Sequence, residues 1–312
     1  MKYVSLFLYL LISNAHAYKI MIYTDQADKA SANEVISTFK KTYPFNQFQI
    51  DFDVRLLKPE ELKCAPLYGI ARLLGCDTLN IARESAVRGV DQAMIIKHSS
   101  DYGGSGGAIP VMSSSSPALT LSHEYLHTLG LCDEYEYAVT EADKYCMLGG
   151  PNMAIIDPDP KGYPSDADAR NKHMRQIPWA SLIKPTTKIS RPPFLGTGTV
   201  NHSAMSSVNS SNEPNKLNSV IGLYEGKTCK NALVTHRVSW QPGQEATIME
   251  YLEAGLGAAN EQIVAKILDS KGVKRKAIEQ KANSAVVDST APVDKSNKGA
   301  DKSNSYGSTI ER

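Results

Sequence analysis

The sequence lacks any long hydrophobic run beyond its N-terminus and carries almost no net charge. No later stretch is long enough to span a bilayer. The formal charge is +1, and no basic patch is interleaved with aromatic residues, which argues against nucleic acid as a partner. The 312 residues are 42% apolar, which is enough for a sizeable core. We therefore expect one large or two small globular domains.

The first 17 residues predict a secretory signal peptide. Lys2 gives a charged start, residues 4–12 form an apolar run too short to span a bilayer, and residues 15–17 read Ala-His-Ala, an A-x-A cleavage site. Cleavage there would leave Tyr18 as the first residue, with no cysteine to receive a lipid. We expect an exported protein, periplasmic or extracellular.

Five cysteines in an exported chain predict disulfides, and the odd number leaves at least one thiol unpaired or intermolecular. Cys64 and Cys76 would close a short loop. Cys132 could pair with Cys146 across the acidic segment between them, or with Cys229. None of the five has the local setting of a catalytic nucleophile.

One stretch, residues 123–135, reads HEYLHTLGLCDEY and has the spacing of a zinc site. His123 and His127 are four residues apart, so on a helix their Cβ atoms lie about 6 Å apart on one face and both side chains can reach one metal ion. Glu124 can then take a proton from a bound water. We expect the helix to begin at Pro117, since proline is favoured in a first turn.

The residues after this helix suggest how a third ligand reaches the metal. Gly130 can adopt a positive φ and end the helix with a sharp turn, which would bring Asp133 back to the ion. Three protein ligands leave a fourth position for water, the arrangement of a catalytic zinc. The alternative is an ordinary amphipathic helix with solvated His and Glu. The glycine and aspartate at metzincin-like spacing favour a metallopeptidase.

The segments before this motif alternate between strand and helix patterns. Strands are predicted at 19–24, 48–54, 93–97 and 108–112, and helices at 31–43, 59–74 and 79–87. Pro110 cannot donate to a sheet ladder, so we place its strand at an edge, where an extended peptide could pair with it. The order predicts an α/β fold: a mixed sheet with an edge strand over the active-site helix.

Composition divides the rest of the chain. After a signal peptide at 1–17, we expect an N-terminal α/β subdomain at 18–130, an irregular C-terminal subdomain at 131–269, and a disordered, Ser- and Lys-rich tail at 270–312. An acidic run could bind calcium, but its spacing does not fit the EF-hand, so a polar surface loop is favoured. Its members are Asp157, Asp159, Asp166 and Asp168.

Two further residue types are expected near the zinc. A methionine in a tight turn gives metzincins an apolar floor beneath the histidines; Met249 is the candidate, with Met147 and Met153 as alternatives. Tyr251 could direct its hydroxyl at a developing oxyanion or bind the metal, and Tyr135 is another candidate. For both tyrosines the alternative is a partly buried surface residue.

Four segments, taken together, are similar to those of a known family. They are the glycine loop at 102–107, the metal helix at 123–135 with its closing Asp-Glu-Tyr, the GLYEG box at 222–226, and the methionine segment at 247–249 with AANE at 258–261. In this order they resemble the IgA-peptidase family of bacterial zinc metallopeptidases, relatives of the metzincins, over roughly residues 90–269. The resemblance implies His123, His127 and Asp133 as zinc ligands and Glu124 as the catalytic base.

The sequence thus predicts a secreted endopeptidase with one zinc ion that hydrolyses protein or peptide substrates. In the family, the spacing from the second histidine to the aspartate is often one residue longer, so Glu134 stands as an alternative third ligand. Two other functions stay open: an exported binding or adhesion protein with a structural zinc, and a zinc amidase that acts on cell-wall peptides.

Overall fold

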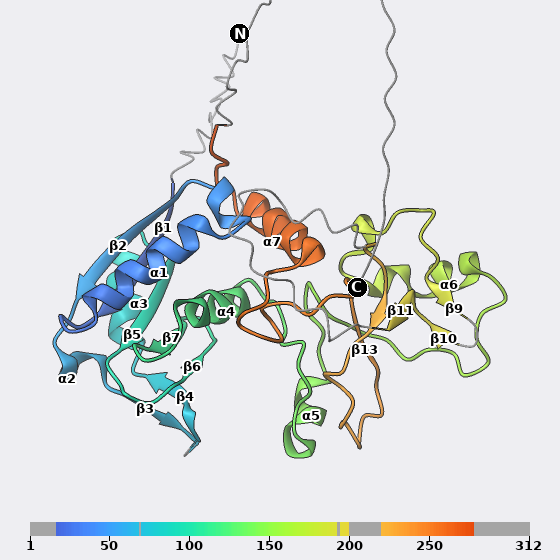
Figure 1. The fold of residues 1–312 in the computed structure, drawn as a ribbon, viewed down its shortest axis with the longest axis horizontal. Coiled ribbons are helices and arrows are strands. Elements are labelled where there is room, and N and C mark those ends of the chain that lie inside the picture. The colour runs from blue at the N-terminus through green and yellow to red at the C-terminus, as the bar shows by residue number, and fades with distance from the viewer. Residues whose placement is uncertain (1–16, 69, 192–193, 200–219, 278–312) are drawn as a thin grey trace, which may run out of the picture. The chain divides into compact units, whose positions relative to one another are not determined.

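A mixed seven-stranded sheet forms the N-terminal half of the protein (Figure 1). The computed structural model describes residues 17–68, 70–191, 194–199 and 220–277, so residues 1–16 of the predicted signal peptide and residues 278–312 of the predicted tail lie outside the described residues. The strand order is β2-β1-β5-β7-β6-β4-β3. The bounds are β1 Tyr18–Thr24, β2 Ile50–Leu56, β3 Cys64–Leu67, β4 Ile70–Cys76, β5 Gln92–Lys97, β6 Gly104–Ser105 and β7 Val111–Ser113.

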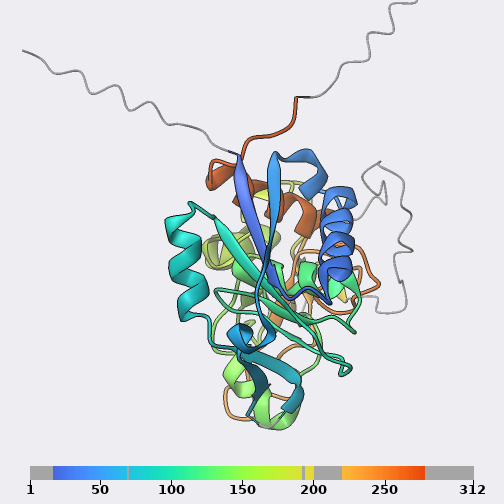
Figure 2. The ribbon, with the colours of Figure 1, turned by 90° about the vertical axis from the view of Figure 1, so that its left-hand side faces the viewer.

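Apolar side chains of β1 alternate between the two faces of this sheet and enter separate cores. Ile20 and Ile22 point into the core beneath α1 (Lys29–Lys41) and α4 (Ala118–Thr128), whereas Met21 and Tyr23 point into the core beneath α3 (Leu79–Val87). Figure 2 shows α1 and α3 on opposite sides of the strands. Because both faces are covered, β1 is an almost continuous apolar run. The predicted α/β class with a mixed sheet is confirmed.

The position of β7 differs from the prediction of an edge strand. It lies between β5, which is parallel to it, and β6, which is antiparallel. Pro110 precedes β7, and its carbonyl accepts a hydrogen bond from the backbone N–H of Ile95. The edge prediction was wrong because the glycine loop folds back and pairs with β7. The sheet instead ends at β2 and β3.

Residues 59–74 also differ from the prediction of one helix. Only α2 (Pro59–Leu62) is helical, and the chain then forms the antiparallel hairpin β3–β4. Cys64 and Cys76 are paired across this hairpin and joined by a disulfide, as predicted. The apolar residues that suggested a helix lie on the two strands of this hairpin instead, and tertiary pairing overrides the weak helical pattern.

The C-terminal half has short elements around a second core. A four-stranded sheet has the order β11-β12-β13-β8, and the indole N–H groups of Trp179 and Trp240 donate to the carbonyls of Gly222 and Ile156. The bounds are α5 Val139–Tyr145, β8 Ala154–Ile155, α6 Asp166–His173, β9 Ser190–Arg191, β10 Phe194–Leu195, β11 Gly198–Thr199, β12 Tyr224–Glu225, β13 Ser239–Gln241 and α7 Ala258–Ser270.

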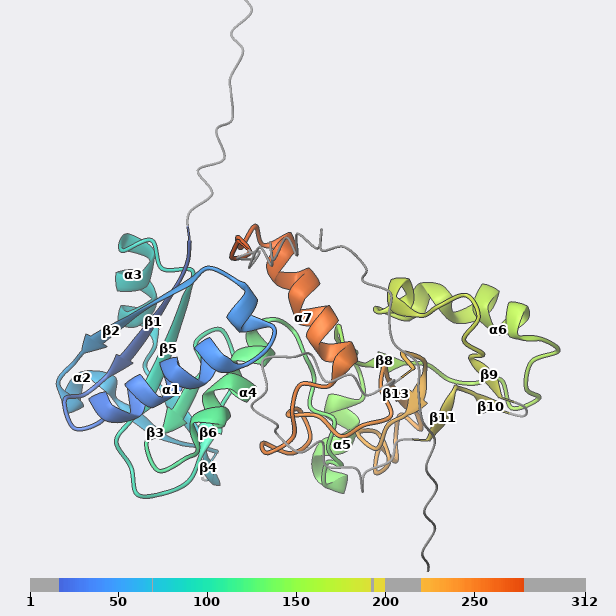
Figure 3. The ribbon, with the colours of Figure 1, turned by 45° about the horizontal axis from the view of Figure 1, so that its top comes forward.

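Helix α7 connects the two halves by packing into both cores (Figure 3). Val264 and Leu268 enter the core of the seven-stranded sheet, and Ile263 enters the core that contains the tryptophans. Met249 also belongs to the first core. Residues on both sides of position 130 therefore share one hydrophobic core. No helix of the described chain is long and apolar enough to cross a membrane.

The second disulfide joins Cys146 to Cys229, a pair that the sequence analysis did not consider. Cys132 is a free cysteine, so the predicted pairing with Cys146 or Cys229 is corrected. The side-chain amide of Asn152 brackets Cys132, accepting from its N–H at 2.8 Å and donating to its carbonyl at 2.9 Å. These bonds hold Cys132 against the 149–153 loop. Cys146, at the end of α5, is instead bonded to Cys229.

Candidate metal centre

Helix α4 presents the two histidines and the glutamate of the predicted site. Its first turn begins after Pro117, and Leu129 caps its C-terminus. Gly130 follows with φ of +89°, a conformation that glycine adopts without steric cost. The chain therefore turns sharply, and Asp133 returns to the histidines, as the spacing predicted.

Three potential ligand atoms converge at one point. Asp133 Oδ1 lies 3.2 Å from His123 Nε2 and 3.3 Å from His127 Nε2, and the two Nε2 atoms are 3.2 Å apart. An ion bound tetrahedrally at about 2.0–2.1 Å separates its ligand atoms by about 3.3 Å. The three side chains thus form one face of a tetrahedron of the size that zinc requires.

The chemistry of these atoms also fits a cation. Asp133 Oδ1 is buried and, although both imidazoles are at ion-pairing distance, it accepts no hydrogen bond of suitable geometry. Buried carboxylate oxygens are rarely left without a partner, and a metal ion would satisfy this one. Two imidazole nitrogens and one carboxylate oxygen are ligands that zinc prefers.

Outer contacts orient all three ligands. His123 Nδ1 lies 2.9 Å from the carbonyl of Ile248, and His127 Nδ1 lies 2.8 Å from the carbonyl of Leu131. A carbonyl can only accept, so each Nδ1 carries a proton, and each Nε2 is the atom left to bind an ion at the centre once it is deprotonated. Asp133 is held in turn through Oδ2, which accepts a hydrogen bond of 2.5 Å from the hydroxyl of Tyr137.

Tyr137 was missed by the sequence analysis. It is buried, and its ring stacks on Tyr145 at 4.0 Å between centroids. The closing aromatic residues of the motif were the available signal, but the sequence analysis considered only Tyr135, whose ring lies 4.9 Å from that of Tyr137.

Glu124 lies next to the converging ligands. Its carboxylate and the two imidazoles form a group whose ligand atoms all lie within 4.8 Å of one another. Burial raises the pKa of Glu124, while positive charge on His123 and His127 would lower it. A carboxylate with a raised pKa is a stronger proton acceptor, as a general base requires.

The glycine loop packs directly against these side chains. A Cβ at Gly104 would come within 2.8 Å of Glu124 Oε1, and a Cβ at Gly106 within 2.9 Å of the His127 side chain. A side chain at Gly106 would therefore clash with His127, and one at Gly104 would displace the carboxylate of Glu124. The loop was predicted to precede a strand, and the structure places it against the metal centre.

Electrostatics couple the aspartate to the histidines. Burial lowers the pKa of His127, but the adjacent negative charge of Asp133 outweighs it and raises that pKa to about 9. The same balance raises the pKa of His123. Burial raises the pKa of Asp133, but the two imidazoles outweigh it, and that pKa is lowered.

Glu134, the alternative ligand, points away from the histidines. Its carboxylate is buried and accepts hydrogen bonds from Asn152 Nδ2 at 2.8 Å, Asn260 Nδ2 at 3.0 Å and Thr247 Oγ1 at 2.6 Å. Its backbone N–H donates to the carbonyl of Met249. Glu134 therefore joins the loop after α4 to α7 and to the turn at Met249, and the structure places Asp133 at the centre.

Met249 is buried in a turn next to the candidate metal centre. The carbonyl of the preceding residue, Ile248, contacts His123 Nδ1. Of the two alternatives, Met147 is 62% exposed and Met153 is buried in the 149–153 loop. Met249 is thus the methionine that this arrangement brings beside the metal helix.

Tyr251 is 41% exposed, and its side chain contacts Lys227. The ammonium of Lys227 donates to the Tyr251 hydroxyl at 3.4 Å and lies 5.3 Å from its ring centroid. Lys227 also forms an ion pair with Glu250. Among the described residues, Tyr251 forms no hydrogen bond with His123, His127 or Asp133.

Three of the four aspartates in the acidic run bind protein side chains. Asp159 binds Lys172, Asp166 binds Arg170, and Asp168 accepts from Ser165. Within the described ranges, the side chains of metal-binding type that lie close enough to hold an ion gather at His123, Glu124 and His127, with Asp133 beside them.

No family model matches the chain, and a search of curated proteins finds no relative. The geometry of the site is therefore the main guide to what the protein does.

Proposed function

We propose that the protein is an exported, zinc-dependent endopeptidase with a metzincin-like site, similar to the IgA-peptidase family. The observation that carries the proposal is the convergence of three ligand atoms at 3.2–3.3 Å with a carboxylate beside them. A structural zinc site usually takes four protein ligands and needs no neighbouring base. Three ligands with Glu124 alongside are the arrangement of a hydrolase.

His123, His127 and Asp133 would hold the ion. When bound, zinc supplies a Lewis acid and lowers the pKa of a coordinated water towards about 7. Glu124 accepts the proton of the attacking water and transfers it to the leaving amine. Tyr251 stays a prediction as donor to the developing oxyanion, and Lys227 would position its hydroxyl.

The test is digestion of a proteome-derived peptide library, read by mass spectrometry, by the mature protein and its variants. Glu124→Gln should lower cleavage by about 10²–10⁴-fold while zinc content stays at the wild-type level. Glu34→Gln, at an exposed position on α1, is the matched control. Asp133→Ala should lose zinc.

Cleavage at wild-type rate by Glu124→Gln would refute the role of the base. Full zinc content in Asp133→Ala would refute the ligand assignment. If the wild-type protein does not digest the peptide library but releases peptides from cell walls, the zinc amidase would replace the endopeptidase as the proposed function.

A further inference from the structure

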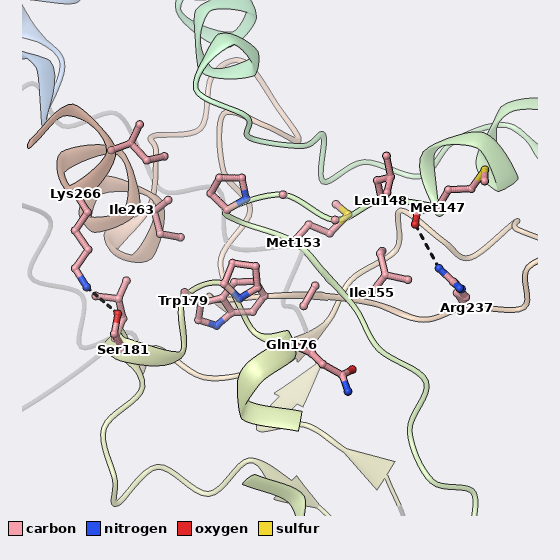
Figure 4. Close-up of a pocket in the computed structure, with 17 residues that line it drawn as sticks. Met147, Leu148, Met153, Ile155, Gln176, Trp179, Ser181, Arg237, Ile263 and Lys266 are labelled. Carbon is pink, nitrogen blue, oxygen red and sulfur yellow. Dashed lines mark hydrogen bonds between the residues drawn. The ribbon is translucent and has the colours of Figure 1, made fainter. Parts of the chain in front are cut away.

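A cavity of about 640 Å³ lies beside the loop that follows the metal helix (Figure 4). Its walls come from residues 147–155, residues 176–182 and the C-terminal half of α7. Trp179, Met153 and Ile263 give it an apolar surface. The volume falls in the range of about 300–1,000 Å³ that is typical of ligand sites.

The charged residues that line this cavity are both cations. Lys266 and Arg237 lie on opposite sides of it in Figure 4, and both side chains are exposed. Lys266 Nζ donates to Ser181 Oγ at 2.9 Å, and the Arg237 guanidinium donates to the carbonyl of Met147 at 3.3 Å. Neither forms a salt bridge within the described part of the chain. Their positive charge is therefore available to an anionic ligand.

The rim next to Arg237 exposes large apolar side chains. Met147 is 62% exposed and Leu148 is 80% exposed, and both line the cavity. They add exposed apolar surface to the apolar walls of the cavity. Exposed apolar surface of this kind, edged by charge, is typical of sites that bind peptides or proteins.

One wall of the cavity is bonded to the loop that carries Asp133. Asn152, within the 147–155 wall, bonds the backbone of Cys132 on both sides and donates to Glu134. Gly150 packs so closely that a Cβ there would lie 2.5 Å from the carbonyl of Gly130. A ligand in the cavity would thus lie against the segment that positions the third metal ligand.

We propose that this cavity binds an extended peptide segment in which apolar side chains are flanked by acidic residues. Two cations on opposite sides of an apolar surface match two carboxylates separated by apolar side chains, whereas a fatty acid has one carboxylate. The statement that this segment belongs to a substrate rests on the proposed peptidase function. Peptide binding itself requires neither zinc nor catalysis.

Binding is measured by fluorescence anisotropy with a fluorescein-labelled peptide, Asp-Leu-Phe-Leu-Phe-Glu, blocked at its C-terminus by an amide. The Glu124→Gln protein is used with a chelator present, so that cleavage cannot remove the probe. Lys266→Glu and Arg237→Glu should each raise the dissociation constant at least about tenfold, as for loss of a charge pair at an interface. The matched control, Lys271→Glu, is exposed at the end of α7 outside the cavity and should change it less than about twofold.

Two further probes distinguish the chemistry of the ligand. A peptide with lysines in place of both acids, and one with serines in place of the apolar residues, should not bind. The proposal is overturned if the Glu124→Gln protein, whose cavity is unaltered, does not bind the acidic peptide, or if it binds dodecanoate and not the peptide. It is also overturned if Lys271→Glu weakens binding as much as Lys266→Glu and Arg237→Glu do.

The peptide library separates this proposal from the peptidase proposal. If both hold, cleavage sites should share an acid-apolar-acid segment at a fixed distance, and Arg237→Glu should abolish that preference while cleavage of short peptides continues. If cleavage is absent but the peptide binds, the binding site stands and the peptidase falls. Cleavage without this preference, combined with no peptide binding, would overturn the binding site alone.

Discussion

Replacing Tyr137 by phenylalanine should weaken zinc binding without disturbing the fold. Its hydroxyl donates a 2.5 Å hydrogen bond to Asp133 Oδ2, the carboxylate oxygen opposite the one that faces the histidines. Burial, and then the charge of Asp133, raise the pKa of Tyr137, so its hydroxyl keeps its proton as a donor at neutral pH. Phenylalanine preserves the ring that stacks on Tyr145 and removes only the donor.

The magnitude follows from the type of hydrogen bond. A hydrogen bond to a charged group contributes about 1.5–3 kcal/mol, and about 1.4 kcal/mol corresponds to a tenfold change in affinity. The bond between Tyr137 and Asp133 does not require zinc, so only part of this energy enters zinc binding. We expect the affinity to fall by about tenfold, at the lower end of the range of about 10–100-fold for outer-shell partners of metal ligands.

The assay is competition for zinc with a chromophoric chelator at neutral pH. Tyr145→Phe is the matched control, because it makes the same chemical change in the stacked ring without a hydrogen bond to Asp133. Thermal unfolding of both variants checks that the fold is retained. A zinc affinity for Tyr137→Phe that equals that of Tyr145→Phe would show that the hydroxyl does not position the ligand.

Two other predictions concern stability. The disulfide between Cys146 and Cys229 spans 83 residues, and the disulfide between Cys64 and Cys76 spans 12. Replacing both cysteines of the first disulfide by alanine should lower the free energy of unfolding by about 4.5 kcal/mol, and replacing both cysteines of the second should lower it by about 3 kcal/mol. Equal losses in guanidinium denaturation would contradict the loop-entropy argument. Burial raises the pKa of Glu261 to about 7, above its value in the unfolded chain, so stability should fall by on the order of 1 kcal/mol as the pH rises from about 5 to about 8. Glu261→Gln should flatten this dependence, and an unchanged pH profile would refute the assignment.

Short-range patterns were the ones that could be predicted from sequence. The spacing of His123 and His127 and the glycine after the helix led to the positions seen in the structure, because helix geometry relates residues four apart. The alternation in β2 likewise led to a half-buried strand. The cysteine pair at 146 and 229, the inner position of β7 and the hairpin at 64–76 could not be predicted, because each depends on partners that are distant in sequence or on strand pairing.

The sequence by itself determined which groups are available for chemistry: two histidines on one helical face, a glutamate beside them, and an aspartate after a glycine turn. Only the tertiary structure decided that Asp133 and not Glu134 faces the histidines. That choice depends on Asn152, Thr247 and Asn260, whose donors hold the Glu134 carboxylate in the core. Hydrogen bonds to a buried charge come from wherever the chain folds past it, and no local spacing encodes them.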